Sequence, residues 1–209
     1  MILSILIPTL PDRAHLLQRV CEHLGAFNPE EVDIVIDNRG REITTGQKRN
    51  ELIARAKGEY VVHVDDDDFP QPNYIKYILE AIEVYKPDCV TFEGWMSTNG
   101  ASFVDWVIKF GESYEARKDS DGITRYYRFP NHIVPIKKSI AESVKFPHVT
   151  QGEDFAWAKA INNAYQDGAI WRTGKNPMIK TSAHIQQKLY HYAFLSLIHI
   201  SEPTRLLSI

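Results

Sequence analysis

Short apolar runs alternate with amphipathic segments along the first 92 residues of the chain, and this alternation restricts its fold more than any other feature. The runs lie at 2–7, 32–36, 59–64 and 89–92, and each has the length and the β-branched content of a strand. Between them, apolar residues recur at helical spacing after Asp12, Thr45 and Asn73, three residues that can begin a helix. Strands that alternate with helices predict βαβ units, and therefore an α/β fold whose mostly parallel, Rossmann-like sheet is flanked by helices.

The pattern changes in the second half of the chain. Between 93 and 128 it loosens, with four glycines and a charged stretch, and we interpret this region as irregular, with a hairpin as one arrangement. A strand-like run follows at 132–136, then a short helix from about Lys138 and a longer helix over 153–164. We expect residues 1–194 to form one domain.

The last fifteen residues, 195–209, resemble the translation of sequencing-adaptor DNA. We expect this tail to be non-native, so that the natural protein continues differently past about Phe194 and the domain is truncated at its C-terminal end. The alternative is a genuine amphipathic tail.

Charge and cysteine content exclude some classes of function. The formal net charge is −3 and the pI about 6.2, so the chain lacks the basic balance of a nucleic-acid-binding protein. The only two cysteines, Cys21 and Cys89, lie in apolar segments, which argues against a disulfide framework and fits a reducing, cytoplasmic location. No stretch reaches the ~18 apolar residues of a membrane-spanning helix, so we expect a soluble chain, with peripheral attachment to a membrane left open.

Acidic residues follow two of the predicted strands, at Asp37 and at the run 65–68. The carboxyl ends of parallel strands meet at one edge of a sheet, where ligands bind, so both signals predict one site. Four adjacent carboxylates raise each other's pKa and favour a bound cation. Mg²⁺ or Mn²⁺ suits a sparse carboxylate site that also holds a diphosphate. The alternative is a solvated acidic turn.

A resemblance to a known family runs through most of the first 90 residues. Residues 46–68 read GQKRNELIARAKGEYVVHVDDDD, and they resemble the family 2 glycosyltransferases of the GT-A fold, the nucleotide-diphospho-sugar transferases. In that family a helix start, an A-x-G-E-Y turn and an apolar strand lead into D-x-D-D. Residues 3–9 are similar to the first strand with its Pro-Thr, although 10–13 depart from the usual continuation, and 34–38 match the second strand.

The resemblance implies roles for individual residues, and it adds a second acidic motif. Nucleotide binding would involve Pro8, Thr9, Arg13, Asp37, Arg49, Asp65 and Asp66, with Asp37 and Arg49 at the base. Metal binding would involve Asp67 as principal ligand, with Asp68, Asp65 and a late histidine, His184. Gln151-Gly152-Glu153-Asp154 resembles the family's E-D motif, which implies Asp154, beside Glu153, as catalytic base. Read alone, Arg49 is a surface helix charge, His184 a satisfied polar residue, and Glu153 and Asp154 favoured by the helix dipole.

The resemblance implies an inverting transferase that moves a sugar, with a UDP-sugar as the expected donor, to a hydroxyl acceptor on a glycan, a lipid-linked carrier or a protein, as in polysaccharide biosynthesis. In such a transfer the base takes the proton of the attacking hydroxyl. His132 and His148 are candidates to line the acceptor site, and Trp95, Trp106, Tyr126 and Tyr127 are candidates to stack on a sugar.

Two alternatives stay open. A nucleotidyltransferase of related fold normally has a glycine-rich loop after the first strand, and 8–13 contain no glycine. A non-catalytic domain that binds nucleotide or glycan has the same sequence pattern.

Overall fold

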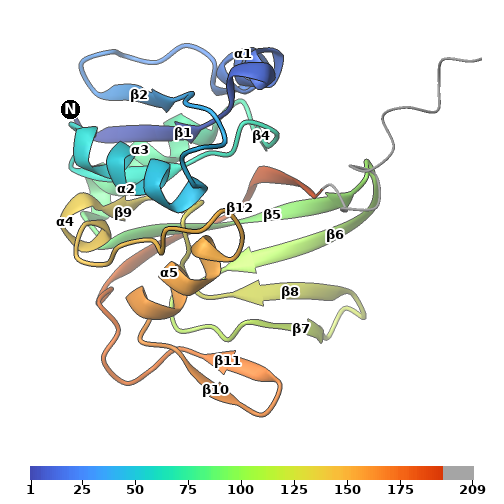
Figure 1. Ribbon diagram of the computed structural model, residues 1–209. Coiled ribbons are helices and arrows are strands. Elements are labelled where there is room, and N and C mark those ends of the chain that lie inside the picture. Colours follow the sequence, from blue (N-terminus) through green and yellow to red (C-terminus); the bar gives the residue numbers. More distant parts are fainter. Residues whose placement is uncertain (195–209) are drawn as a thin grey trace, which may run out of the picture.

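β1 (Leu3–Pro8) lies between two parallel partners, β2 (Val32–Asp37) and β3 (Tyr60–His63). The structure is a computed structural model that describes residues 1–194 (Figure 1). Every residue of β1 is buried, as expected for a parallel strand that helices cover on both faces. The parallel pairing of these three strands confirms the βαβ units predicted from the sequence.

Helices connect the strands of this N-terminal half. A short 3₁₀ turn, η1 (Pro11–Arg13), leads into α1 (Ala14–Leu24), and α3 (Tyr74–Tyr85) follows β4 (Phe69–Pro70). Between β2 and β3 lies α2 (Thr45–Arg55). Its N-cap is Thr44 rather than Thr45, because the Thr44 side chain and Gln47 form a reciprocal capping box.

The region 93–128, which we expected to be irregular, consists mainly of strands. β5 (Cys89–Thr98) and β6 (Ala101–Ile108) form an antiparallel hairpin, as one reading of the sequence allowed. β8 (Thr124–Arg128) pairs with β6 and with β7 (Glu115–Lys118). These strands are half-exposed, so polar residues interrupt the apolar pattern that marks buried strands.

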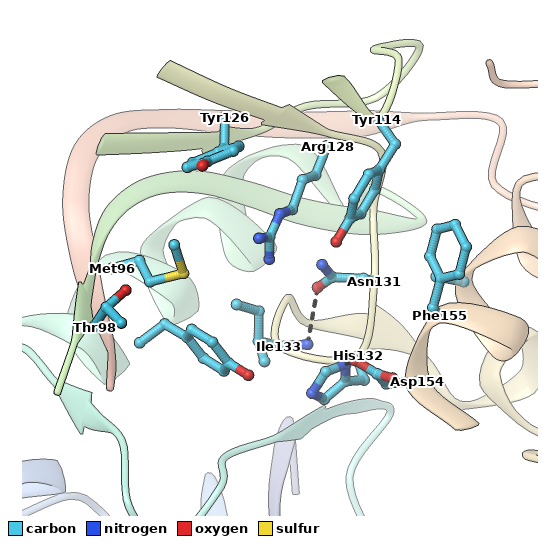
Figure 2. Close-up of a pocket in the computed structure, with 12 residues that line it drawn as sticks. Met96, Thr98, Tyr114, Tyr126, Arg128, Asn131, His132, Ile133, Asp154 and Phe155 are labelled. Atoms are coloured by element: carbon cyan, nitrogen blue, oxygen red, sulfur yellow. Dashed lines mark hydrogen bonds and ion pairs between the residues drawn. The ribbon is translucent and has the colours of Figure 1, made fainter. Parts of the chain in front are cut away.

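The predicted strand at 132–136 is wrong. Residues 131–134 form a turn in which the side chain of Asn131 accepts a hydrogen bond from the backbone N–H of Ile133 at 3.2 Å (Figure 2). Only β9 (Ile136–Lys137) is extended, and it joins β3 to β5. α4 (Lys138–Ala141) follows, and α5 (Glu153–Ile161) ends three residues before the predicted end.

β12 (Ser182–Phe194) returns through the middle of the sheet after the small ribbon of β10 (Tyr165–Asp167) and β11 (Ile170–Arg172). It runs parallel to β5 and antiparallel to β4, so the strand order of the main path is β2-β1-β3-β9-β5-β6-β8-β7 with β12 beside β5. Among residues 1–194, no helix is long and apolar enough to cross a membrane. The predicted non-native tail, 195–209, lies outside the described residues.

Candidate active site

The ends of β1, β2 and β3 meet at one edge of the sheet, as the two acidic signals predicted. Pro8 of β1 is paired with Asp37 of β2. The next residue, Thr9, links both signals, because its N–H donates to the carbonyl of Asp37 at 2.8 Å and its hydroxyl to the carboxylate of Asp66 at 2.5 Å. The two acidic signals therefore belong to one site.

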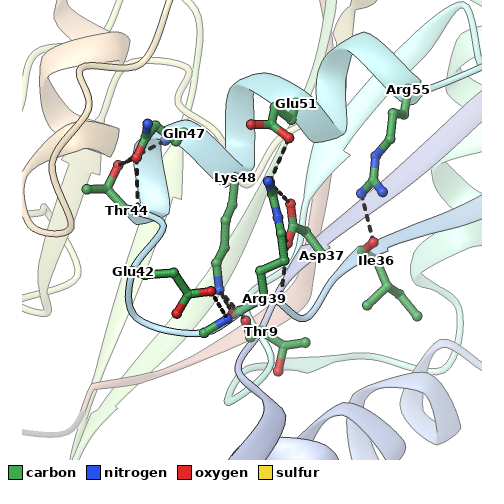
Figure 3. Close-up of polar contacts among 11 residues, drawn as sticks. Thr9, Ile36, Asp37, Arg39, Glu42, Thr44, Gln47, Lys48, Glu51 and Arg55 are labelled. Carbon is green, nitrogen blue, oxygen red and sulfur yellow. Dashed lines mark hydrogen bonds and ion pairs between the residues drawn. The ribbon is translucent and has the colours of Figure 1, made fainter.

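Two cations that the sequence analysis did not select surround Asp37 (Figure 3). The guanidinium of Arg39 donates to both carboxylate oxygens of Asp37, at 3.0 and 2.5 Å. Burial acts to raise the pKa of Asp37, but the hydrogen bonds and charge of Arg39 outweigh it and lower that pKa. The buried Lys48 donates its ammonium to the backbone carbonyls of Thr9 and Arg39, which fixes the loop after β2. A nucleobase contact by Asp37 stays a prediction.

The four aspartates after β3 divide into two buried and two accessible side chains. Asp66 and Asp68 are buried. Asp66 accepts from Thr9 and pairs with Arg13 at 2.9 Å, and burial raises its pKa to about 6. Asp68 accepts from the hydroxyl of Tyr190 at 2.8 Å and from the backbone N–H of Ala193 at 3.0 Å, so it ties β12 to this loop. Burial raises the pKa of Asp68 well above its usual range.

The side chains of Asp65 and Asp67 are 24% and 28% exposed. Asp67 pairs with Arg13 at 2.7 Å. Within residues 1–194, no cluster of three or more histidine, cysteine, aspartate or glutamate side chains forms a cage for a metal. Two accessible carboxylates still fit Mg²⁺ or Mn²⁺, because these ions need only one or two carboxylates when phosphate and water complete the shell. Metal binding by Asp65, Asp67 or Asp68 stays a prediction.

Arg49 of α2 is buried between two carboxylates. Its Nη2 lies 2.8 Å from Asp65 Oδ1 and its Nε 3.2 Å from Glu153 Oε1 at the start of α5. Burial acts to raise the pKa of Asp65, and the charge of Arg49 outweighs it and lowers that pKa. In the structure Arg49 therefore joins the acidic loop to the E-D motif. Its contact with the nucleobase of a donor stays a prediction.

His132 lies between the acidic loop and the predicted base, a position that the sequence did not reveal. Its Nε2 is 3.6 Å from Asp65 Oδ2 and its Nδ1 is 4.0 Å from Asp154 Oδ2. Its side chain is 7% exposed, and neither ring nitrogen has a hydrogen-bond partner within residues 1–194. One imidazole ring thus separates Asp65 from Asp154, whose carboxylate is 43% exposed.

Asp154 opens into a cavity of about 400 Å³ between α5, β5, β8 and β12. Figure 2 shows Tyr114, Tyr126, Arg128 and Asn131 around it. The lining residues are Met96, Thr98, Tyr114, Tyr126, Arg128, Asn131, His132, Ile133, Asp154, Phe155, Ala158 and Tyr192. Of the aromatic candidates, only Tyr126 lines this cavity, and Trp106 is in the core.

The remaining predicted histidines lie elsewhere. On β12, His184 contacts Thr91 at 3.0 Å and Glu93 at 3.8 Å, and no described contact joins it to the acidic loop. Its role as a metal ligand stays a prediction. His191 lies closer to that loop, because it is paired with Phe69 of β4. His148 is exposed and does not line the cavity.

The family model for glycosyl transferase family 2 matches residues 28–142. Solved structures of S. aureus TarS have a similar fold. TarS 1-349 in complex with UDP aligns with a TM-score of 0.65 and 16% identity over 92% of this chain and 60% of that chain. The complex with UDP-GlcNAc aligns with a TM-score of 0.60 and 14% identity over 98% and 62%. This chain therefore spans about 60% of the length of those TarS structures. No curated protein sequence matches it.

Proposed function

This chain belongs to glycosyl transferase family 2, and on that premise we propose that it moves a sugar from a nucleotide diphosphate donor to a hydroxyl acceptor with inversion. The observation that carries the proposal is the position of His132, between Asp65 of the acidic loop and Asp154 in the cavity. An inverting transfer needs a base beside the anomeric carbon, on the face opposite the leaving diphosphate. Asp65 and Asp154 lie on opposite sides of the His132 ring, so Asp65 suits the side of the leaving diphosphate and Asp154 suits the role of the base.

The donor is proposed to be a UDP-sugar, because two of the solved structures of similar fold contain UDP and UDP-GlcNAc. Its nucleotide would lie at the edge formed by Thr9 and Asp37, where β1 and β2 end. Arg13 would lie near the diphosphate, since its guanidinium is already beside Asp66 and Asp67.

Asp67 and Asp65 would hold Mn²⁺ or Mg²⁺, because their side chains are the accessible members of the acidic run. When bound, the ion supplies Lewis-acid stabilisation of the leaving diphosphate. Arg49 pairs with Asp65 and so fixes the position of its carboxylate. Arg13 pairs with Asp67 and offsets negative charge of the acidic run.

Asp154 would take the proton of the acceptor hydroxyl. Its carboxylate is accessible from the cavity, whereas Glu153 is buried against Arg49. Burial raises the pKa of Glu153, and Arg49 partly offsets this rise. Glu153 therefore suits a positioning role, in which it anchors the start of α5 and so directs Asp154 into the cavity.

The test combines UDP binding, measured by calorimetry with and without Mn²⁺, and turnover of UDP-GlcNAc. Asp154→Asn is expected to lower turnover by roughly 10²–10⁴-fold and to leave UDP binding unchanged. Asp67→Asn is expected to weaken Mn²⁺-dependent UDP binding, and the exposed Asp121→Asn is the matched control that changes neither.

Three results would contradict parts of the proposal. UDP binding that a chelator does not change would refute the metal. Full turnover by Asp154→Asn would refute the base. Nucleotide binding without turnover of any nucleotide sugar would favour a non-catalytic domain.

A further inference from the structure

The cavity beside Asp154 contains a positive charge that no described carboxylate neutralises. The guanidinium of Arg128 lines the cavity and points into it (Figure 2). Arg128 forms no ion pair among residues 1–194, and its Nε is buried without a hydrogen-bond partner. Cζ of the guanidinium lies 5.1 Å from the centroid of the Tyr114 ring. Because the buried Nε lacks a hydrogen-bond partner and no described carboxylate pairs with the half-buried guanidinium, its positive charge is available to an anion in the cavity.

The other arginines of this part of the sheet show that the missing partner is specific to Arg128. Arg125, on the same strand, pairs with Asp119 at 2.6 Å and with Asp121 at 2.7 Å. Arg117 of β7 pairs with Glu112 at 3.2 Å. Side chains of a strand alternate between its two faces, so Arg128 and Tyr126 share the cavity face whereas Arg125 faces away. The described carboxylates near β7 and β8 therefore pair with Arg117 and Arg125, and none of them pairs with Arg128.

The cavity contains one positive and one negative side chain, Arg128 and Asp154, at separate positions. Among residues 1–194, Asp154 is the only carboxylate that lines it, and no ion pair within 4.0 Å joins it to Arg128. Figure 2 shows the amide of Asn131 between the two side chains, with Tyr114 beside it, and Tyr126 also lines the cavity. A ligand that fits this pattern presents a hydroxyl to Asp154 and a negative group to Arg128.

We propose that the acceptor carries a phosphate or carboxylate group, which Arg128 binds while Asp154 receives the acceptor hydroxyl. This inference rests on the proposed function, since it assigns the cavity to the acceptor. A guanidinium can donate two parallel hydrogen bonds to either anion, so phosphate and carboxylate share one recognition chemistry. The tyrosine rings contact the neutral part of the acceptor.

The proposal is tested with pairs of probes, each with a neutral and an anionic member of the same skeleton: glycerol with glycerol 3-phosphate, and methyl glucoside with methyl glucuronide. Binding of each probe to the protein loaded with UDP and Mn²⁺ is measured by calorimetry, and kcat/KM is measured with UDP-GlcNAc as donor. The wild type is expected to favour at least one charged member by roughly ten- to a hundredfold. Arg128→Gln is expected to abolish this preference, Arg128→Lys to keep part of it, and Arg125→Gln, the matched control, to retain it.

Equal binding of charged and neutral probes by the wild type would overturn the proposal. It would also fail if Arg128→Gln, with an unchanged melting temperature, weakened binding of both members equally. Hydrolysis of UDP-glucuronate and UDP-glucose in the same variants forms a separate arm. A preference for the charged donor that disappears in Arg128→Gln would place the anion on the donor and overturn the acceptor assignment. Charge-selective binding that depends on Arg128, without turnover of any donor, would instead refute the proposed function alone.

Discussion

Replacement of Asp68 distinguishes a structural carboxyl group from a metal ligand within the acidic run. Asp68→Ala removes the acceptor of the buried Tyr190 hydroxyl and of the partly buried Ala193 backbone N–H. A buried donor without an acceptor costs about 1–3 kcal/mol, so the Tyr190 hydroxyl alone predicts a loss of about that size in the free energy of unfolding, and Ala193 adds to it. Asp68→Asn keeps both contacts, because the amide oxygen accepts from Ala193 and the amide NH₂ can donate to Tyr190.

The difference in the free energy of unfolding between Asp68→Asn and the wild type should depend on pH, and the pKa of Asp68 gives the direction of this dependence. Because the pKa of Asp68 is raised on folding, its contribution is favourable below the ordinary value of 3.8 and is lost as the pH rises toward the folded-state pKa. Asp68→Asn has no such loss. The stability of Asp68→Asn relative to the wild type should therefore increase with pH, by up to about 1.4 kcal/mol per pH unit.

The assay is urea unfolding of the wild type, Asp68→Asn and Asp68→Ala at pH 5.5 and pH 8.0, together with calorimetric UDP binding in Mn²⁺. Asp68→Asn should bind UDP as the wild type does. Asp67→Asn, the matched change one position earlier, should lose Mn²⁺-dependent binding and keep its stability. The reasoning would be refuted if Asp68→Asn lost Mn²⁺-dependent binding while its unfolding curves matched those of the wild type at both pH values.

Three further substitutions test the framework around the site. Arg49→Met leaves the carboxylates of Asp65 and Glu153 without their cation and should lower the free energy of unfolding in urea by about 3–5 kcal/mol; a loss below about 1 kcal/mol would contradict this. Gly46→Ala places a methyl group against the carbonyl oxygen of Pro147, so it should lower both the melting temperature and the turnover of UDP-sugar. The control Gly100→Ala, whose methyl group meets no atom, should lower the melting temperature at most and leave turnover unchanged. Burial lowers the pKa of His63 well below 6.5, so the unfolded chain binds more protons and stability is lost as the pH falls below about 6.5. His63→Phe should lose less stability than the wild type between pH 7.5 and 5.5 in thermal unfolding, and equal losses would count against a neutral buried His63.

The sequence predicted the first half of the fold because buried parallel strands are nearly continuous apolar runs. β1 and β3 have this pattern, the half-buried β2 has it in part, and each was placed to within two residues. The long strand β12 was not predicted, since its polar and apolar residues follow no single period and its register shifts twice against β5. Its partners, β4 and β5, are more than 80 residues away in the sequence, and local patterns carry no information about such pairing.

The sequence drew attention to several residues of the candidate site but not to their arrangement. The positions of Asp65 and Asp154 followed from motifs, whereas their connection through His132 depends on the turn at 131–134 that the sequence represented as a strand. The ion pairs of Arg49 could not be predicted either, because they join segments that are distant in the sequence and come together only in the folded chain. Only the turn-rich segment after Asp37 could have drawn attention to Arg39.

The acidic run itself shows how four adjacent carboxylates are accommodated. The backbone N–H of Asp68 donates to the carbonyl of Asp65 at 3.1 Å, so the run forms a turn rather than an extended strand. In this turn Asp66 and Asp68 point inward, the first to Arg13 and Thr9, the second to β12, where burial favours its neutral form. The repulsion that the sequence implied is therefore relieved within the protein for two of the four carboxylates. Asp65 and Asp67 stay accessible. Arg49 pairs with Asp65, whereas Asp67 shares the single guanidinium of Arg13 with Asp66, so Asp67 is the carboxylate at which an added positive charge would be most favourable.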